Sequence, residues 1–182
     1  MSKNLVIRCL VCLALVFALG SCSTVFLNNS GGSGLDALGE PRLLEMQMHL
    51  TRQSSSYSMD LVVEVRKQGL IVIGSSFGVR VFTLSYDGDA ITEGVGRGMP
   101  SYVPNKLIID DIILAISPGA SLEGGLPKNC RLVRDGQAGN IYCNDKLLVS
   151  VQHQKTVNKN ELVLIERYQP EYKVSFVISE VK

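Results

Sequence analysis

The strongest constraint on the fold lies in residues 69–88, GLIVIGSSFGVRVFTLSYDG, which are typical of two short strands joined by a tight turn. Residues 70–73 are apolar at every position, as in a strand that is covered on both faces. Residues 79–86 are rich in β-branched and aromatic side chains and end at Asp87-Gly88, a strong turn signal. We therefore expect a hairpin whose turn, residues 74–78, carries Phe77 at its tip, either folded back as a plug or exposed to a partner.

The strands around this hairpin show an alternating pattern, because apolar and polar residues take turns from Leu43 to Thr51 and again from Met59 to Arg66. This period of two predicts half-buried antiparallel strands with one dry face and one wet face. Further strands are expected near residues 90–93 and over 130–143, 146–154, 161–168 and 172–181. Nine or ten strands of this kind predict one large sheet, and sheets of that size seldom remain flat and open.

One convincing helix interrupts the strands at about residues 105–117, after Pro104 and before Pro118-Gly119, with Asn105 as a possible cap. Seven of its residues are large and aliphatic, too many for a narrow stripe, so the helix is expected to lie on the dry face of the sheet. A short helical turn is expected at residues 121–126. The predicted fold is mainly β (α+β): a large curled antiparallel sheet around one main helix.

The N-terminus carries a targeting signal rather than part of the fold. Lys3 and Arg8 precede an apolar run that ends in Leu19-Gly20-Ser21-Cys22. This segment resembles a bacterial lipoprotein signal, in which an apolar residue and two small ones precede the cysteine that is lipidated. An ordinary signal peptide or a membrane anchor is the alternative, but the run is short for a bilayer span.

The signal resemblance divides the chain into a signal peptide (1–21), a lipidated Cys22 with a flexible linker (22–34) and a single domain (35–182). Ser23 stands where the inner-membrane retention signal would have Asp, which implies the periplasmic face of the outer membrane. Without Lys3 and Arg8 the chain has 16 basic and 17 acidic residues, and no basic cluster, so nucleic acid is not expected as a partner.

Cys130 and Cys143 are the two cysteines left for the domain, in a compartment where disulfides persist. A two-residue turn at Gly136-Gln137 would place them directly opposite each other on a non-hydrogen-bonded pair, where Cα atoms come closest. A redox or metal pair is the alternative, but Cys130 and Cys143 are not spaced as a CxxC motif and have no nearby histidines. A structural disulfide is therefore expected.

No enzyme signature or cofactor motif is present. His49 and His153 lack partners at metal-ligand spacing, and no GxSxG motif marks a nucleophilic serine. Asp110-Asp111 could be a carboxylate pair, but a narrow solvated edge of the helix is the favoured interpretation. The glycine-rich run at residues 94–98 lacks the ending of a phosphate-binding loop and is interpreted as a plain loop.

Residues 69–119, with the strand pair, Val103-Pro104 and the apolar helix ending in Ser117-Pro118-Gly119, resemble the bacterial lipoprotein family DUF 3261. The resemblance extends over residues 43–181 and is most specific at GVRVFTLSYDG, residues 78–88. Members of that family occur in gene clusters for aryl polyene lipids. The resemblance implies an outer-membrane lipoprotein, and no cofactor is expected.

More distantly, the order of elements is similar to LolA and LolB, which sort lipoproteins and fold as half-barrels with an apolar cavity for acyl chains. This likeness implies that Phe77 contacts the membrane, although Ser75 and Ser76 depart from the Pro-containing turn of LolB. It also favours a ligand cavity over plain core beneath the helix, with a lining that is rich in adaptable methionine. The expected lining residues are Met46, Met48, Met59, Leu61, Val63, Phe82, Ile109, Ile112 and Ile113.

Three functions remain open. The first is a monomeric outer-membrane lipoprotein that binds or transfers a lipoprotein, a lipid or an aryl polyene lipid, which it receives from a LolA-like periplasmic donor. The second is a structural envelope lipoprotein with a plain core and a protein partner. The third, a lipid-modifying hydrolase, would need a Ser or Asp beside a histidine in a cleft.

Overall fold

The computed structural model describes residues 38–94, 103–117, 123, 126–157 and 160–181. The signal peptide, Cys22, the linker, most of the glycine-rich run and most of the expected helical turn at 121–126 lie outside the described residues. Among the described residues, no helix is long and apolar enough to cross a membrane.

Ten antiparallel strands form one sheet in the order β5-β4-β3-β2-β1-β10-β9-β8-β7-β6. Every neighbouring pair except β1 and β10 is also consecutive in the chain, so two meanders, β1–β5 and β6–β10, join where the first strand pairs with the last. The strands are β1 (Arg42–Arg52), β2 (Ser55–Arg66), β3 (Gly69–Ser76), β4 (Val79–Tyr86), β5 (Ile91–Glu93), β6 (Cys130–Asp135), β7 (Ala138–Cys143), β8 (Lys146–Lys155), β9 (Glu161–Tyr168) and β10 (Glu171–Glu180).

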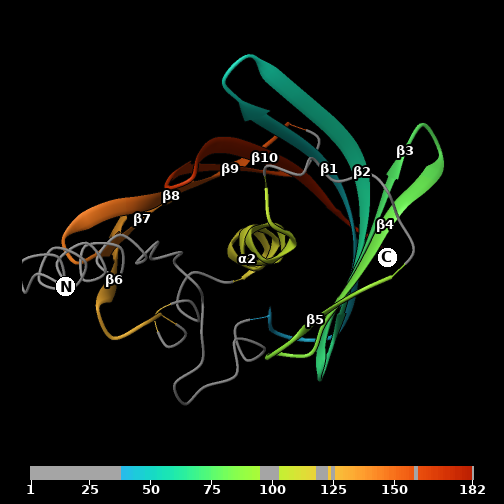
Figure 1. Cartoon of the computed structure of the whole chain (residues 1–182), viewed down its shortest axis with the longest axis horizontal. Helices are drawn as coiled ribbons and strands as arrows, with labels where there is room; N and C mark the ends of the chain where they lie inside the picture. Colours follow the sequence, from blue (N-terminus) through green and yellow to red (C-terminus); the bar gives the residue numbers. More distant parts are fainter. Residues whose placement is uncertain (1–37, 95–102, 118–122, 124–125, 158–159, 182) are drawn as a thin grey trace, which may run out of the picture.

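The sheet curls around α2 (Asn105–Ile116), which connects the two meanders and lies on the concave face (Figure 1). Within the described residues the sheet is not closed, because β5 and β6 lie at its two edges. The predicted class is thereby confirmed: a mainly β, curled antiparallel sheet with one main helix.

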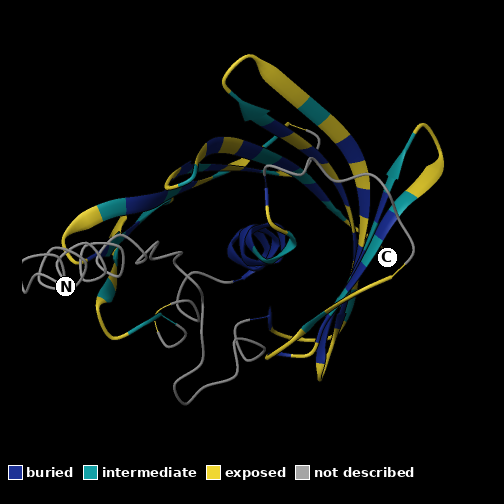
Figure 2. Cartoon of the chain, in the orientation of Figure 1, coloured by how far each residue is buried: buried dark blue, intermediate teal, exposed yellow. Residues whose placement is uncertain are grey.

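Alternation along the strands separates a buried concave face from an outer face that is partly exposed (Figure 2). β1 shows the pattern most clearly, since its even-numbered residues from Leu44 to Leu50 are buried and the residues between them are exposed.

The prediction that residues 70–73 are covered on both faces was wrong. Ile71 and Ile73 of β3 are only half-buried, because no described helix or strand covers the outer face of that strand.

The β3–β4 hairpin is tighter than predicted. β3 continues to Ser76, and only Phe77 and Gly78 form the turn, both with positive φ (51° and 76°) as in the two-residue turns that match the twist of a hairpin. Within β3, position 74 requires glycine, because a Cβ there would lie 2.2 Å from Cε1 of the Phe82 ring. The missing side chain lets Phe82 lie across β3 on the concave face.

The helix begins without the expected cap. Asn105 is the first helical residue, and the preceding residue, Pro104, provides no side-chain hydrogen bond. The Asn105 amide instead donates to the Glu93 carboxylate in β5, which ties the start of α2 to the edge of the sheet. Ten consecutive residues from Leu107 to Ile116 are buried, so packing rather than capping fixes the helix.

Candidate functional site

The nine residues expected to line a cavity form a packed core in the structure. They lie on β1, β2, β4 and α2, and none is more than 4% exposed. The helix fills the concave face above them, so these side chains contact one another and α2. None of the nine borders the groove described next.

A groove opens on the other side of the helix, between the C-terminal end of α2 and strands β6, β7 and β8. Its volume is about 410 Å³, within the range of small-molecule sites. Small residues leave the space: Ala115 on the helix, and Ala138 and Gly139 on β7. The apolar lining consists of Leu114, Ile116, Leu132, Ile141 and Val151.

Polar side chains form a rim at one end of this groove. Strand register places Arg134 opposite Gly139, which in turn faces Val151, so Arg134 and His153 belong to the concave row of their strands. His153 Nδ1 lies 2.7 Å from Glu161 Oε1, and Arg134 Nε lies 3.8 Å from Glu123 Oε1. The groove thus passes from an apolar interior to a charged rim.

The C-terminal end of α2 closes one side of the groove. Arg42 donates through Nη2 to the Ile116 carbonyl oxygen at 2.9 Å and through Nη1 to the Leu38 carbonyl oxygen at 2.8 Å. A guanidinium at this position satisfies a free helix carbonyl and offsets the negative end of the helix dipole. The next residue, Ser117, lines the groove, and its buried Oγ has no hydrogen-bond partner in the described part of the chain.

A buried polar cluster pins the helix to the sheet. Asp111, fully buried on α2, accepts 2.6 Å hydrogen bonds from Arg167 Nε on β9 and from the Tyr172 hydroxyl on β10. Burial raises the pKa of Asp111, while Arg167 and Tyr172 act in the opposite direction. The expected solvated edge of the helix was therefore wrong, because this face of α2 meets the concave row that contains Arg167.

Asp110 is also buried, at 3% exposure, and no described residue forms a hydrogen bond with its Oδ2. Loss of solvent raises the pKa of this carboxyl to about 7, against the opposing charges of Arg167 and Lys106. The same carboxylate, second to burial, raises the pKa of Tyr86. A proton on Asp110 removes most of the cost of this buried carboxyl.

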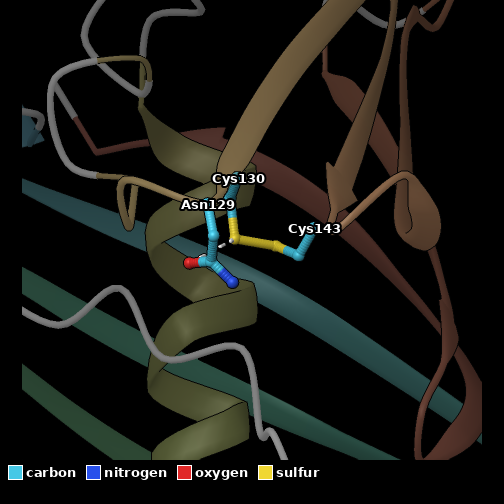
Figure 3. The surroundings of a disulfide bond; sticks show 3 residues. All are labelled: Asn129, Cys130 and Cys143. Atoms are coloured by element: carbon cyan, nitrogen blue, oxygen red, sulfur yellow. Dashed lines mark hydrogen bonds between the residues drawn. A yellow bond between two sulfur atoms is a disulfide. The ribbon is translucent and has the colours of Figure 1, made fainter.

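The predicted disulfide is present and supports the groove. Cys130 and Cys143 are directly opposite on β6 and β7, with Cα atoms 4.1 Å apart (Figure 3), and the turn is Gly136-Gln137 as expected. β6 is an edge strand with one neighbour only. The disulfide therefore fastens the groove wall that has the least support from the sheet.

Phe77 is fully exposed at the turn of the β3–β4 hairpin, and Val79 beside it is 66% exposed. Of the two alternatives, the folded-back plug is wrong in this structure. β3 and β6 run in opposite directions in the sheet, so the Phe77-Gly78 turn and the groove turn Gly136-Gln137 leave it at opposite strand ends.

Neither histidine belongs to a metal site in the described part of the chain, where no group of three or more His, Cys, Asp or Glu residues is close enough to hold an ion. His49 Nδ1 lies 2.6 Å from Ser58 Oγ on the outer face. His153 is the one that reaches the groove.

The groove residues were missed at the sequence level, although a signal was present. Leu132-Arg134, Val151-His153 and Glu161-Val163 each place a charged or polar residue two positions from an apolar one, on the same face of a strand. A polar residue among the inward-facing apolar positions of a strand marks the point where the concave face reaches solvent.

Comparison with known proteins gives a family and no function. The model of the family described as "Protein of unknown function (DUF3261)" matches residues 44–180. No curated protein matches. Among solved structures, a DUF1329 family protein from Desulfovibrio piger aligns with 11% identity and a TM-score of 0.37, over 80% of this chain and 87% of that one.

Proposed function

Because the chain belongs to the DUF3261 family, whose function is unknown, we propose a function from its own residues: it is a non-enzymatic outer-membrane lipoprotein that binds or transfers a hydrophobic acylated molecule in the periplasm. The groove beside α2 carries this proposal. It offers about 410 Å³, an apolar interior and a polar rim, which suits a molecule with an apolar chain and a polar head.

The binding energy would come from burial of the acyl chain against Leu132, Ile141, Val151 and the end of α2. Burial contributes roughly 25 cal/mol per Å² of apolar surface, from which the cost of association is subtracted. A larger ligand would reach the predicted lining, from Met46 to Ile113, only after α2 moved away from the sheet.

We propose two contacts with the membrane, one through Cys22 and one through the turn of the β3–β4 hairpin. Acyl chains on Cys22 would hold the protein at the outer membrane, since two or more chains give stable anchoring. Phe77 and Val79 would insert their exposed side chains into a bilayer during transfer. A LolA-like protein is the proposed donor, and the chain is proposed to act as a monomer.

The test is native mass spectrometry of the chain from Ser23 to Lys182, which retains every described residue, after gentle purification from its own periplasm. We expect a bound lipid or polyene, and we expect Gly139→Phe to lose it, because the new ring would fill the groove next to Leu132. Ala90→Phe, at an exposed position that does not line the groove, is the matched control. Wild-type protein that is empty and also fails to take up N-phenyl-1-naphthylamine would contradict the proposal.

One observation favours a second candidate, a structural envelope lipoprotein with a protein partner. The residues predicted to line the cavity are all packed as core in the described structure, as they would be in a protein that binds nothing there. An empty groove in the native mass spectra, together with co-purification of a defined envelope protein, would support this second function.

A further inference from the structure

We propose that the groove selects an amphiphile with an uncharged polar head, an acyl ester or amide, over one with an anionic head such as a fatty acid. This inference rests on the proposed function and names the ligand class for the same site. Three features of the groove carry it: the pairing of its basic side chains, a buried hydroxyl without a partner among the described residues, and its size.

The basic side chains at the groove already have partners. His153 lies against Glu161, Arg134 faces Glu123, and the Arg42 guanidinium is bound to the carbonyl oxygens of Leu38 and Ile116. An anionic head would have to displace a carboxylate or a carbonyl before it could bind a cation. It would also lie beside Glu161, whose charge repels it.

In the part of the chain that the structure describes, the C-terminal end of α2 offers no free cation to an anionic head. Leu114, Ala115 and Ile116 form the groove wall there, and the Arg42 guanidinium that offsets the negative end of the helix dipole is already bound to two carbonyl oxygens. An uncharged head needs no cation at this wall. The pairing of the basic side chains and the charge of Glu161 therefore separate the two classes of head.

We assign the polar contact to Ser117. It is 3% exposed and lines the groove, and its buried hydroxyl has no hydrogen-bond partner among the described residues. Buried hydroxyls nearly always have a partner in folded proteins, so this one is unusual. An ester or amide carbonyl of a ligand would accept its hydrogen bond without bringing a charge into the groove.

The size of the groove limits the ligand to a single chain. A volume of about 410 Å³ lies near the lower end of the range for small-molecule sites. A molecule with several acyl chains would place one of them here and leave the others outside. A monoacyl ester is therefore the smallest suitable probe.

The test is a competition between 1-monopalmitoylglycerol and palmitate at equal concentration, with the chain from Ser23 to Lys182, read by native mass spectrometry at pH 7.5. We expect the ester complex to exceed the palmitate complex by about tenfold, which corresponds to about 1.4 kcal/mol. Equal binding, or more palmitate than ester, would overturn this inference and leave the proposed function standing. Binding of neither probe would overturn both.

Two variants identify the residues responsible. Ser117→Ala should weaken the ester complex by about three- to tenfold and leave palmitate unchanged, with Ser150→Ala on β8 outside the groove as the control. Glu161→Gln should strengthen palmitate binding at least about threefold, because it frees His153 and removes a repulsive charge. A purely structural effect would change both ligands equally, and that result would overturn the assigned roles.

Discussion

The two sides of α2 differ in how completely the sheet covers them. On the side of β1–β4 the concave face is sealed, and residues such as Met48 and Leu61 are no more than 1% exposed. On the side of β6–β8 the inward-facing positions include Arg134, Gly139 and His153, and these residues line an open groove. The same alternating pattern thus produces core on one side and a candidate site on the other.

The position of the helix causes this difference. Asp111 binds Arg167 and Tyr172 on β9 and β10, which fixes α2 over the middle of the sheet. Large aliphatic residues of α2 then fill the space above β1–β4, while Ala115 and Ser117 face the groove. Residues on the sheet alone do not decide what is site and what is core.

The largest expected effect on stability comes from the buried cluster of Asp111, Arg167 and Tyr172. Asp111→Ala leaves the Arg167 guanidinium buried without its counter-ion and should lower the free energy of unfolding by about 3–5 kcal/mol. Urea denaturation of the variant and of the exposed-pair control Glu64→Ala would measure this. A loss below about 1 kcal/mol would mean that the cluster does not hold the helix.

Asp110 should make stability depend on pH. Its folded pKa of about 7 lies above the ordinary 3.8, so the folded state retains a proton that the unfolded chain releases. We expect the contribution of Asp110 to the free energy of unfolding to have its full value below about pH 4. It should fall as the pH rises to about 7, by roughly 4 kcal/mol in total.

Asp110→Asn should abolish that decline, and its advantage over wild type should therefore grow between pH 4.5 and 7.5 in urea denaturation. Asp60→Asn, the same substitution at an exposed position, serves as the control. Parallel pH profiles for wild type and Asp110→Asn would contradict the raised pKa.

The groove side depends on its disulfide. Cys130→Ser with Cys143→Ser should reduce stability by about 3 kcal/mol, the loss expected for a loop closed across 13 residues of separation. Hydrogen exchange should increase most in β6 and β7, because β6 is an edge strand. Uniformly faster exchange across β1–β4 would contradict the local role.

A matched pair of truncations compares the two sides directly. Met48→Ala, in the sealed core, should cost about 2–5 kcal/mol, whereas Leu132→Ala, half-buried at the groove, should cost about 1 kcal/mol. Chemical denaturation of both variants provides the measurement. Equal costs would show that the groove side is packed as tightly as the core.

Phe77 gives the smallest expected effect on folding. Because its side chain is fully exposed, Phe77→Glu should change stability by less than about 0.5 kcal/mol and abolish insertion into lipid vesicles. Vesicle flotation with Val157→Glu, another fully exposed apolar residue, as the control separates the hairpin tip from exposure in general. Undiminished flotation of Phe77→Glu would remove the membrane-contact role.

Local pattern predicted most of the fold. The period of two from Leu44 to Leu50, the Gly136-Gln137 turn and the cysteine pair identified strands, register and disulfide, because each depends on neighbours in sequence. The helix was predicted from its aliphatic run. The half-buried state of Ile71 and Ile73 was missed, since coverage of an outer face depends on what the rest of the chain leaves open.

The candidate site was much harder to predict. Asp110 and Asp111 have partners or neighbours more than 50 residues away in sequence, at Arg167 and Tyr172, so a local pattern suggested solvent. The methionine-rich lining was inferred from the alternation along the first two strands and from the likeness to LolA and LolB, but whether such a row becomes cavity or core depends on where α2 packs. The groove follows from helix position and sheet curvature, which no short motif encodes.

The most direct test of the groove as the ligand site is hydrogen–deuterium exchange of the chain from Ser23 to Lys182, with and without 1-monopalmitoylglycerol. We expect added protection in β6, β7, β8 and the C-terminal end of α2, with no change in β1–β4. Protection of β1–β4 with faster exchange in α2 would contradict it, because the ligand would then occupy the core that the helix now fills.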